Sequence, residues 1–198
     1  KFEAYANRDS LSYRESYNLN EIPTMLRGTL RRPGFSKAWN VFVQLGMTDD
    51  SFELSNVSTM TCREFINSFL EYDIIKSVES KVQDYLSLDK EVMDKLIWLG
   101  LFENKKIGLD RGTPAQVLQH ILESKWSLKA DDKDMIVMQH LFEYTLNGKD
   151  HKLKSSLVLR GEDQTNTAMS MTVGLPVAIA TELILTDKIN MSGVKIPI

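Results

Sequence analysis

The sequence predicts an α+β fold in which a mixed or antiparallel sheet carries helices packed on it. Three observations lead to this expectation. Residues 1–5 and 24–31 alternate as strands do, apolar residues recur at helical spacing between residues 35 and 126, and Asn147-Gly148 separates two apolar-rich stretches. Hydrophobic residues make up 42% and charged residues 26% of the 198 residues, which is enough apolar material for one core. We therefore expect a single domain over residues 1–198.

The segment from Thr24 to Arg31 has a polar, cationic face if its backbone is extended. Alternation places four residues on that face, namely Met25, Arg27, Thr29 and Arg31, and leaves Leu26, Gly28 and Leu30 on the other. Pro33 and Gly34 then end the strand.

Helical spacing predicts five helices between this strand and residue 127. The first runs from Phe35 until Gly46 supplies a C-terminal stop. Three short helices follow Thr61, with apolar stripes that begin at Phe65, Val78 and Val92. The fifth has Thr113 as its N-cap and Pro114 at its first position, and it ends near Trp126.

A hairpin and a last helix complete the prediction. Met135 to Leu146 form one strand, Asn147-Gly148 suits a type I′ turn, and His151 to Leu159 form the return strand. Thr167 is the expected N-cap of a helix that runs to about Leu185.

Gly174 and Pro176 lie inside this last helix, so we expect a kink or two abutting helices there. Its small residues predict tight packing against a sheet, and the alternative is close approach of another backbone or a ligand.

Charge and composition exclude several classes of protein. The formal net charge of −3 argues against a nucleic-acid surface built on excess positive charge. The longest apolar stretch, Val173 to Leu185, is interrupted and shorter than the roughly 20 residues that span a bilayer, so we expect no membrane partner. Cys62 is the only cysteine, which favours a reducing, cytoplasmic setting.

The common catalytic motifs are missing from the sequence. There is no G-x-G, no G-x-x-x-x-G-K-[ST] and no G-x-S-x-G, so the chain offers no glycine-rich turn for a dinucleotide. His120, His140 and His151 have no metal-ligand spacing with one another or with Cys62, and we therefore expect no metal. Isolated histidines of this kind are usually structural.

Arginines are the remaining candidates for a binding site. Arg8 lies in Tyr5-Ala-Asn-Arg-Asp-Ser10, and Arg27, Arg31 and Arg32 surround Gly28-Thr29. A guanidinium can bind a carboxylate through two parallel hydrogen bonds, which suits an amino acid or a dicarboxylic acid. The alternative is that Arg8 pairs with a nearby acid and that the others are solvated surface charges.

Five segments, in the same order along the chain, resemble the L-glutamate-forming saccharopine dehydrogenases, also called saccharopine reductases. They are Tyr5-Ala-Asn-Arg-Asp-Ser10, Leu26-Arg-Gly-Thr-Leu-Arg31 with Gly34-Phe35, Trp98-Leu-Gly-Leu-Phe102, Asp134-Met-Ile-Val-Met-Gln-His140 and Ala168 to Ala180. The resemblance covers most of the chain, although residues 48–94 match loosely.

The resemblance implies the second, substrate-binding and dimerisation domain of a Rossmann-type dehydrogenase, with the Rossmann domain itself absent from this sequence. It implies interconversion of saccharopine with L-glutamate and 2-aminoadipate 6-semialdehyde, with NADP or NAD bound mainly by the Rossmann domain, and a homodimer. By motif position, Arg8, Thr29, Leu30 and Arg31 correspond to substrate-binding residues. No catalytic acid or base can be placed.

Two alternatives stay open. Related reductases act on other carboxylated amines such as carboxynorspermidine, and a non-catalytic interaction domain could keep the fold. Because the sequence starts at Lys1 without methionine and ends on an apolar stretch, we expect a fragment of a longer enzyme that is inactive alone.

Overall fold

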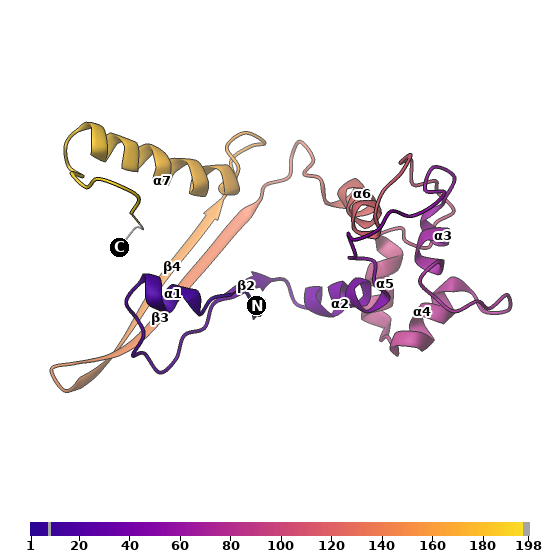
Figure 1. Ribbon diagram of the computed structural model, residues 1–198, viewed down its shortest axis with the longest axis horizontal. Coiled ribbons are helices and arrows are strands. Elements are labelled where there is room, and N and C mark those ends of the chain that lie inside the picture. Colours follow the sequence, from indigo (N-terminus) through magenta and orange to yellow (C-terminus); the bar gives the residue numbers. More distant parts are fainter. Residues whose placement is uncertain (8, 196–198) are drawn as a thin grey trace. The chain divides into compact units, whose positions relative to one another are not determined.

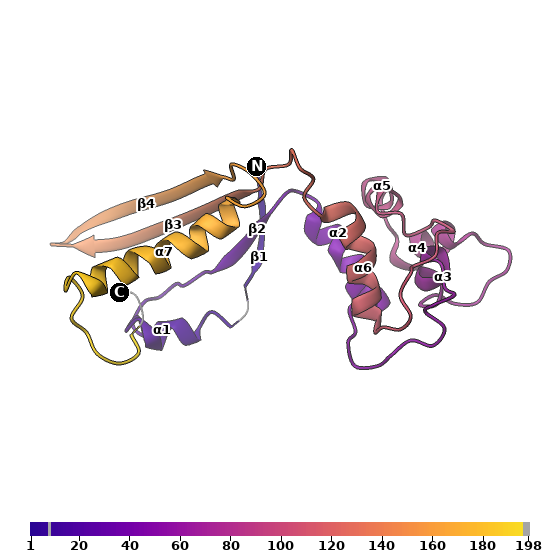
Figure 2. The same ribbon diagram turned by 90° about the horizontal axis from the view of Figure 1, so that it is seen from above.

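The computed structural model describes residues 1–7 and 9–195 and contains helices with small antiparallel sheets (Figures 1 and 2). The α+β class and the antiparallel pairing are confirmed, although the strands form two separate two-stranded sheets. The described residues divide into two compact units: residues 1–7 with 26–127, and residues 9–25 with 128–195.

The first unit begins with a short antiparallel hairpin. Strand β1 (Glu3–Ala6) pairs with β2 (Gly28–Arg31), with Glu3 opposite Arg31 and Tyr5 opposite Thr29. Strand β2 is shorter than the predicted Thr24–Arg31 segment because β1 offers only four partners. A further hydrogen bond, from Asn7 N–H to the Arg27 carbonyl at 3.1 Å, extends the contact by one residue.

Five helices form the core of the first unit, as predicted. They are α2 (Phe35–Leu45), α3 (Cys62–Asn67), α4 (Val78–Leu86), α5 (Lys90–Trp98) and α6 (Pro114–Trp126). Their apolar stripes meet in one cluster in which Phe42, Phe65 and Leu96 are at most 1% exposed. Helices α2 and α6 lie side by side (Figure 2), and the rings of Trp39 and Trp126 stack with centroids 6.3 Å apart.

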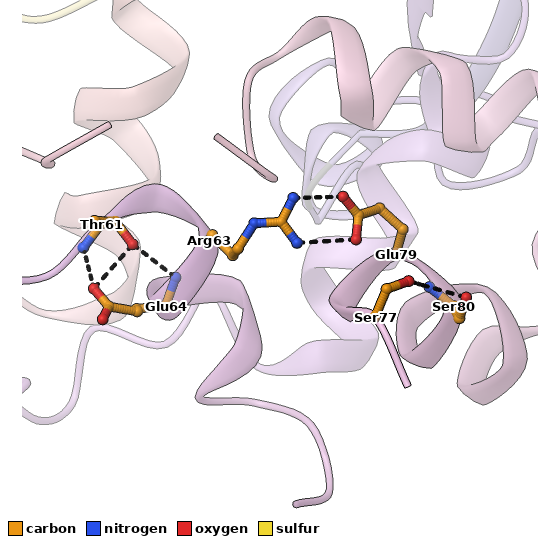
Figure 3. A network of polar contacts seen from close by, with 6 residues as sticks. All are labelled: Thr61, Arg63, Glu64, Ser77, Glu79 and Ser80. Carbon is orange, nitrogen blue, oxygen red and sulfur yellow. Dashed lines mark hydrogen bonds and ion pairs between the residues drawn. The ribbon is translucent and has the colours of Figure 1, made fainter. Parts of the chain in front are cut away.

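Local signals fix the ends of these helices. Thr113 accepts a hydrogen bond from Gln116 N–H in a capping box, with Pro114 at the first turn. Gly46 ends α2 in the left-handed region, with φ of 79°. Thr61 and Glu64 form a second capping box at the start of α3 (Figure 3).

A two-pronged ion pair joins α3 to α4. The Arg63 guanidinium donates to both Glu79 carboxylate oxygens, at 3.0 and 2.6 Å, and both side chains are about two-thirds buried (Figure 3). The hydrogen bonds from Arg63 lower the pKa of Glu79 below its ordinary value.

The second unit consists of helix α1 (Ser12–Ser16), a long hairpin and a last helix. Strand β3 (Met135–Leu146) pairs in register with β4 (Lys149–Arg160). Asn147 and Gly148 both have positive φ, 52° and 72°, as a type I′ turn requires. The tight turn pairs Leu146 directly with Lys149, which is why β4 starts two residues before the prediction.

Helix α7 (Ala168–Leu185) is anchored at the open end of this hairpin (Figure 1). Thr167 is its N-cap, as predicted, and accepts a hydrogen bond from Ser170 N–H. The Asp134 carboxylate, just before β3, accepts from Ala168 N–H at 2.6 Å and from Met169 N–H at 2.9 Å. A negative charge at this end also interacts favourably with the helix dipole.

The rest of α7 departs from the sequence prediction. It is one continuous helix through Pro176, so the alternative of two abutting helices is wrong. Ala168 is buried, but the later small residues Gly174, Ala178 and Ala180 are exposed, and a Cβ on Gly174 would meet nothing within 4 Å. Helix α7 is also long and apolar enough to cross a membrane by length and composition, with a mean hydropathy of 1.7 and 6% of it buried. A single helix of this kind is weak evidence for a membrane span.

The sequence did not predict helix α1. Its five residues bury no side chain, and the Arg14 guanidinium holds the following loop by donating to the carbonyls of Asn20 and Ile22, the latter at 2.9 Å. The Asp9 carboxylate also accepts hydrogen bonds from Leu11 and Ser12 N–H at the start of the helix. Such a helix lacks the apolar stripe from which the other helices were predicted.

We expect Glu79→Gln to lower the free energy of unfolding by about 1 kcal/mol at neutral pH, because it removes one partner of a charge-assisted pair. The pKa of Glu79 is lowered in the folded chain, so its contribution is present above the ordinary glutamate pKa and is lost as the pH falls through the lowered value. Denaturant titrations between about pH 7 and pH 3 should therefore show a smaller acid loss in the variant. Glu143→Gln, which breaks an exposed ion pair with Lys152, is the control and should change little. If the free energy of unfolding falls equally with pH in wild type and Glu79→Gln, the Arg63–Glu79 pair is not the source of this acid sensitivity.

We expect Gly161→Ala to destabilise the second unit by about 1–3 kcal/mol, the usual cost of overpacking. A Cβ at Gly161 would lie 2.2 Å from the Asp134 Oδ1 that binds the start of α7. Chemical denaturation followed by helical circular dichroism measures the effect. The matched control is Gly174→Ala in open space, which should be neutral or stabilising because alanine favours a helix. A Gly161→Ala protein as stable as the control would refute this account.

Candidate substrate site

An open cavity of about 810 Å³ lies in the first unit where the β1–β2 hairpin meets α2 and α6. Its lining combines one cation with aromatic and small polar side chains: Tyr5, Arg31, Phe35, Ser36, Trp39, Asn40, Val43 and Trp126. Arg31 is the only charged residue of this lining, so the cavity suits an anionic ligand with an apolar part.

Aromatic rings hold the guanidinium of Arg31. Its central carbon lies 5.7 Å from the ring centroid of Tyr5 and 5.4 Å from that of Phe35, both within cation–π range. Its Nη1 donates to the Leu30 carbonyl at 2.9 Å. Within the described part of the chain Arg31 makes no ion pair with a carboxylate.

The structure separates the three predicted site residues of β2. Thr29 and Arg31 lie on the same face, as predicted, and Thr29 is opposite Tyr5 in the register. Leu30 lies on the other face of the strand, opposite Ala4. Of the three, only Arg31 lines the cavity, whereas the Leu30 carbonyl accepts a hydrogen bond from the Arg31 guanidinium.

Arg8, the fourth predicted site residue, lies outside the described residues. Its neighbour Asn7 is joined to the start of β2 through the Arg27 carbonyl. The first residue of N-R-D-S is therefore hydrogen-bonded to the first residue of R-G-T-L-R, although the two are 20 positions apart in the sequence.

A carboxylate fixes the turn between β2 and α2. Glu3 accepts hydrogen bonds from Gly34 N–H at 2.8 Å and from Ser36 N–H at 2.6 Å. The bond from Ser36, followed by that from Gly34, lowers the pKa of Glu3 below its ordinary value. This strand–turn–helix segment does not fit a cofactor phosphate, because Glu3 already binds the amides that a phosphate would use.

The site offers binding groups, and its lining contains no aspartate, glutamate, histidine, lysine or cysteine. His120 and His140 are exposed, and His140 stacks on Phe142 in the second unit. Cys62 is buried in the core, where desolvation raises the pKa of its thiol and makes it a poor nucleophile. No cluster of metal ligands occurs among the described residues. The chemistry supported here is the binding and orientation of a carboxylate.

A second cavity of about 500 Å³ shares Trp39 and Trp126 with the first. Its one charged lining residue is Glu123, so it does not suit a carboxylate substrate.

Sequence reasoning missed Glu3 and the aromatic residues of the cavity. Phe35, Trp39 and Trp126 were predicted as helical residues, and their spacing gives no sign that three rings from two helices gather beside a cation. The signal that could have found Glu3 was its alternation position, which places it opposite Arg31 once the hairpin is known.

Comparisons with known proteins show the family to which the chain belongs. The family described as "Saccharopine dehydrogenase C-terminal domain" matches residues 1–198. The L-glutamate-forming, NADP(+) saccharopine dehydrogenase of Schizosaccharomyces pombe is 34% identical over 99% of this chain and 46% of that protein. The mitochondrial alpha-aminoadipic semialdehyde synthase of Bos taurus is 33% identical over 98% of the chain and 22% of its own length.

The fold matches as well. The apo saccharopine dehydrogenase (L-Glu forming) from Saccharomyces cerevisiae superposes with a TM-score of 0.82 at 29% identity, covering 98% of this chain and 45% of that one. The chain thus spans about half the length of these fungal relatives. It belongs to the saccharopine dehydrogenase C-terminal domain family.

Proposed function

We propose that this chain is the substrate-binding and dimerisation domain of an NADP-dependent, L-glutamate-forming saccharopine dehydrogenase of lysine metabolism. That enzyme interconverts saccharopine with L-glutamate and 2-aminoadipate 6-semialdehyde. The observation that carries the proposal is a guanidinium without a carboxylate partner among the described residues, in the lining of an open cavity, in a chain of this family. The names of the fungal relatives support the reaction and the choice of NADP.

The residues of this chain would bind and orient the substrate. Saccharopine carries three carboxylates and a secondary amine, and Arg31 can hold one carboxylate through two parallel hydrogen bonds. Arg8, by motif position, would hold another. Fixing two carboxylates orients the carbon that loses hydride, which is the contribution that positioning makes to such a reaction. A nicotinamide cofactor, bound outside this sequence, would supply the hydride acceptor.

We expect Arg31→Ala in the full-length enzyme to raise the KM for saccharopine, or lower kcat/KM, by about tenfold to a hundredfold, because a substrate carboxylate loses its charged partner. Arg31→Lys should recover part of the loss, since an ammonium cannot donate in parallel. Arg8→Ala should cost about 2–5 kcal/mol in kcat/KM for the same reason. Steady-state kinetics with saccharopine, and with carboxynorspermidine as the competing substrate, measures these effects.

The control is the KM for NADP, which should change less than about twofold in every arginine variant. If KM and kcat/KM for saccharopine in the arginine variants stay within twofold of wild type, these arginines are surface charges and do not bind the substrate. A preference for carboxynorspermidine would identify the related reductase, and no activity on either substrate would favour a non-catalytic domain.

The second unit supports the dimer part of the proposal. Large apolar side chains on both strands of the hairpin are exposed, including Leu141 at 68%, Phe142 at 51% and Val158 at 63%. An isolated two-stranded hairpin of this length is marginal in water, and unpaired strand edges need cover. A second copy related by twofold symmetry would bury the same surface on both subunits.

We expect the full-length enzyme to sediment as a homodimer at about 50 μM without detergent, since the free energy of burying this apolar surface favours association. Analytical ultracentrifugation measures the mass. Phe142→Lys should shift the equilibrium toward monomer, and Tyr72→Lys, at an exposed position of the first unit, is the control. A monomeric wild type would refute the dimer, and recovery only with membranes would indicate that α7 spans a bilayer.

We also propose the cytoplasm as the compartment. Cys62, the one cysteine of the sequence, is buried and free, so no intramolecular disulfide calls for an oxidising environment. Cell fractionation checks this.

A further inference from the structure

Glu3 and Arg31 are direct cross-strand partners that do not pair with each other. The register places them opposite one another, so their side chains project from the same face of the β1–β2 hairpin. Opposite charges in this position normally attract and form an ion pair. Here the carboxylate turns instead to the backbone, and both of its oxygens are engaged by Gly34 N–H and Ser36 N–H.

These two hydrogen bonds fix the position of Phe35. Glu3 binds the amides on either side of this residue, and Gly34 adopts a φ of 85° that lets the chain turn into α2. A Cβ on Gly34 would lie 2.8 Å from Lys95 Nζ and 2.9 Å from Glu91 Oε1 of α5, so any other residue at this position would have to displace these side-chain ends as well as adopt a positive φ. The ring of Phe35 is thereby held 5.4 Å from the guanidinium of Arg31.

The same arrangement keeps the carboxylate of Glu3 from neutralising Arg31. A guanidinium paired with an internal carboxylate would have to lose that partner before it could bind a substrate carboxylate. A guanidinium held by the rings of Tyr5 and Phe35 keeps its donors for the ligand, because a ring face is a weaker partner than a carboxylate.

We infer that Glu3 is a positioning residue for Arg31: it places Phe35 against the guanidinium and, by binding the backbone of the turn, leaves that guanidinium available to a substrate carboxylate. This inference rests on the proposed function, in which Arg31 binds saccharopine.

The test is a double-mutant cycle in the full-length enzyme. Glu3→Ala should raise the KM for saccharopine by about tenfold with kcat little changed, because it acts on binding through Arg31. In an Arg31→Ala background, the same substitution should change KM by less than about twofold. A merely structural role for Glu3 would give the same factor in both backgrounds. The loss of thermal stability caused by Glu3→Ala, in contrast, should be similar in the wild-type and Arg31→Ala backgrounds.

Two further variants keep the test decisive. Glu3→Gln retains one acceptor oxygen for the turn and should fall between wild type and Glu3→Ala. Phe35→Leu removes the ring and leaves Glu3 in place. It should raise the KM for saccharopine, and its effect should be non-additive with that of Arg31→Ala. This variant provides the test if Glu3→Ala does not fold. The matched control is Glu64→Ala, which removes a carboxylate that accepts from a backbone amide, Thr61 N–H at 2.8 Å, in another part of the same unit. It should lower the melting temperature and leave KM unchanged.

The possible failures are distinguishable. If Arg31→Ala raises KM while Glu3→Ala and Phe35→Leu do not, the positioning role is overturned and the proposed function stands. Additive effects of Glu3→Ala and Arg31→Ala overturn the positioning role in the same way. If Arg31→Ala itself has no effect, the site assignment fails and the inference fails with it.

Discussion

The carboxylate of Glu3 connects the two kinds of structure in the first unit. It belongs to a strand, yet its hydrogen bonds go to the backbone at the start of α2, so the hairpin and the helical core are fastened at one turn. Strand β1 has four residues and strand β2 has four, which is too little to be stable alone. The cavity exists because this hairpin is held against helices that have a core of their own.

The sequence predicts well where a feature depends on neighbours in the chain. Thr113-Pro114 and Gly46 mark helix ends because capping involves residues within one turn, and Asn147-Gly148 marks its hairpin because the turn demands positive φ at both positions. The cavity could not be predicted in this way. Trp39 and Trp126 lie 87 positions apart in the sequence, and only the packing of α2 on α6 stacks them.

The same distinction explains the errors at the last helix. The small residues of α7 predict close packing, but those after Ala168 are largely exposed, as are large apolar residues of β3 and β4. Periodicity indicates that a surface is to be covered but does not identify what covers it. Asp134 shows what the hairpin contributes by itself: it binds the first amides of α7 and so sets the point from which the exposed helix starts.

The two units have different surface chemistry, which suits them to different kinds of binding. The first unit has a buried core and presents one cation in an aromatic cavity, which suits recognition of a small anion. The second has almost no buried side chains and exposes apolar strands and a helix, which suits contact with other polypeptide. A binding site needs rigid support, since a guanidinium free to move loses much of its gain from a two-pronged contact. The apolar cluster of α2 to α6 supplies that rigidity. The hydrogen bonds of Glu3 to the start of α2 then fix the hairpin that bears Arg31 to this rigid core.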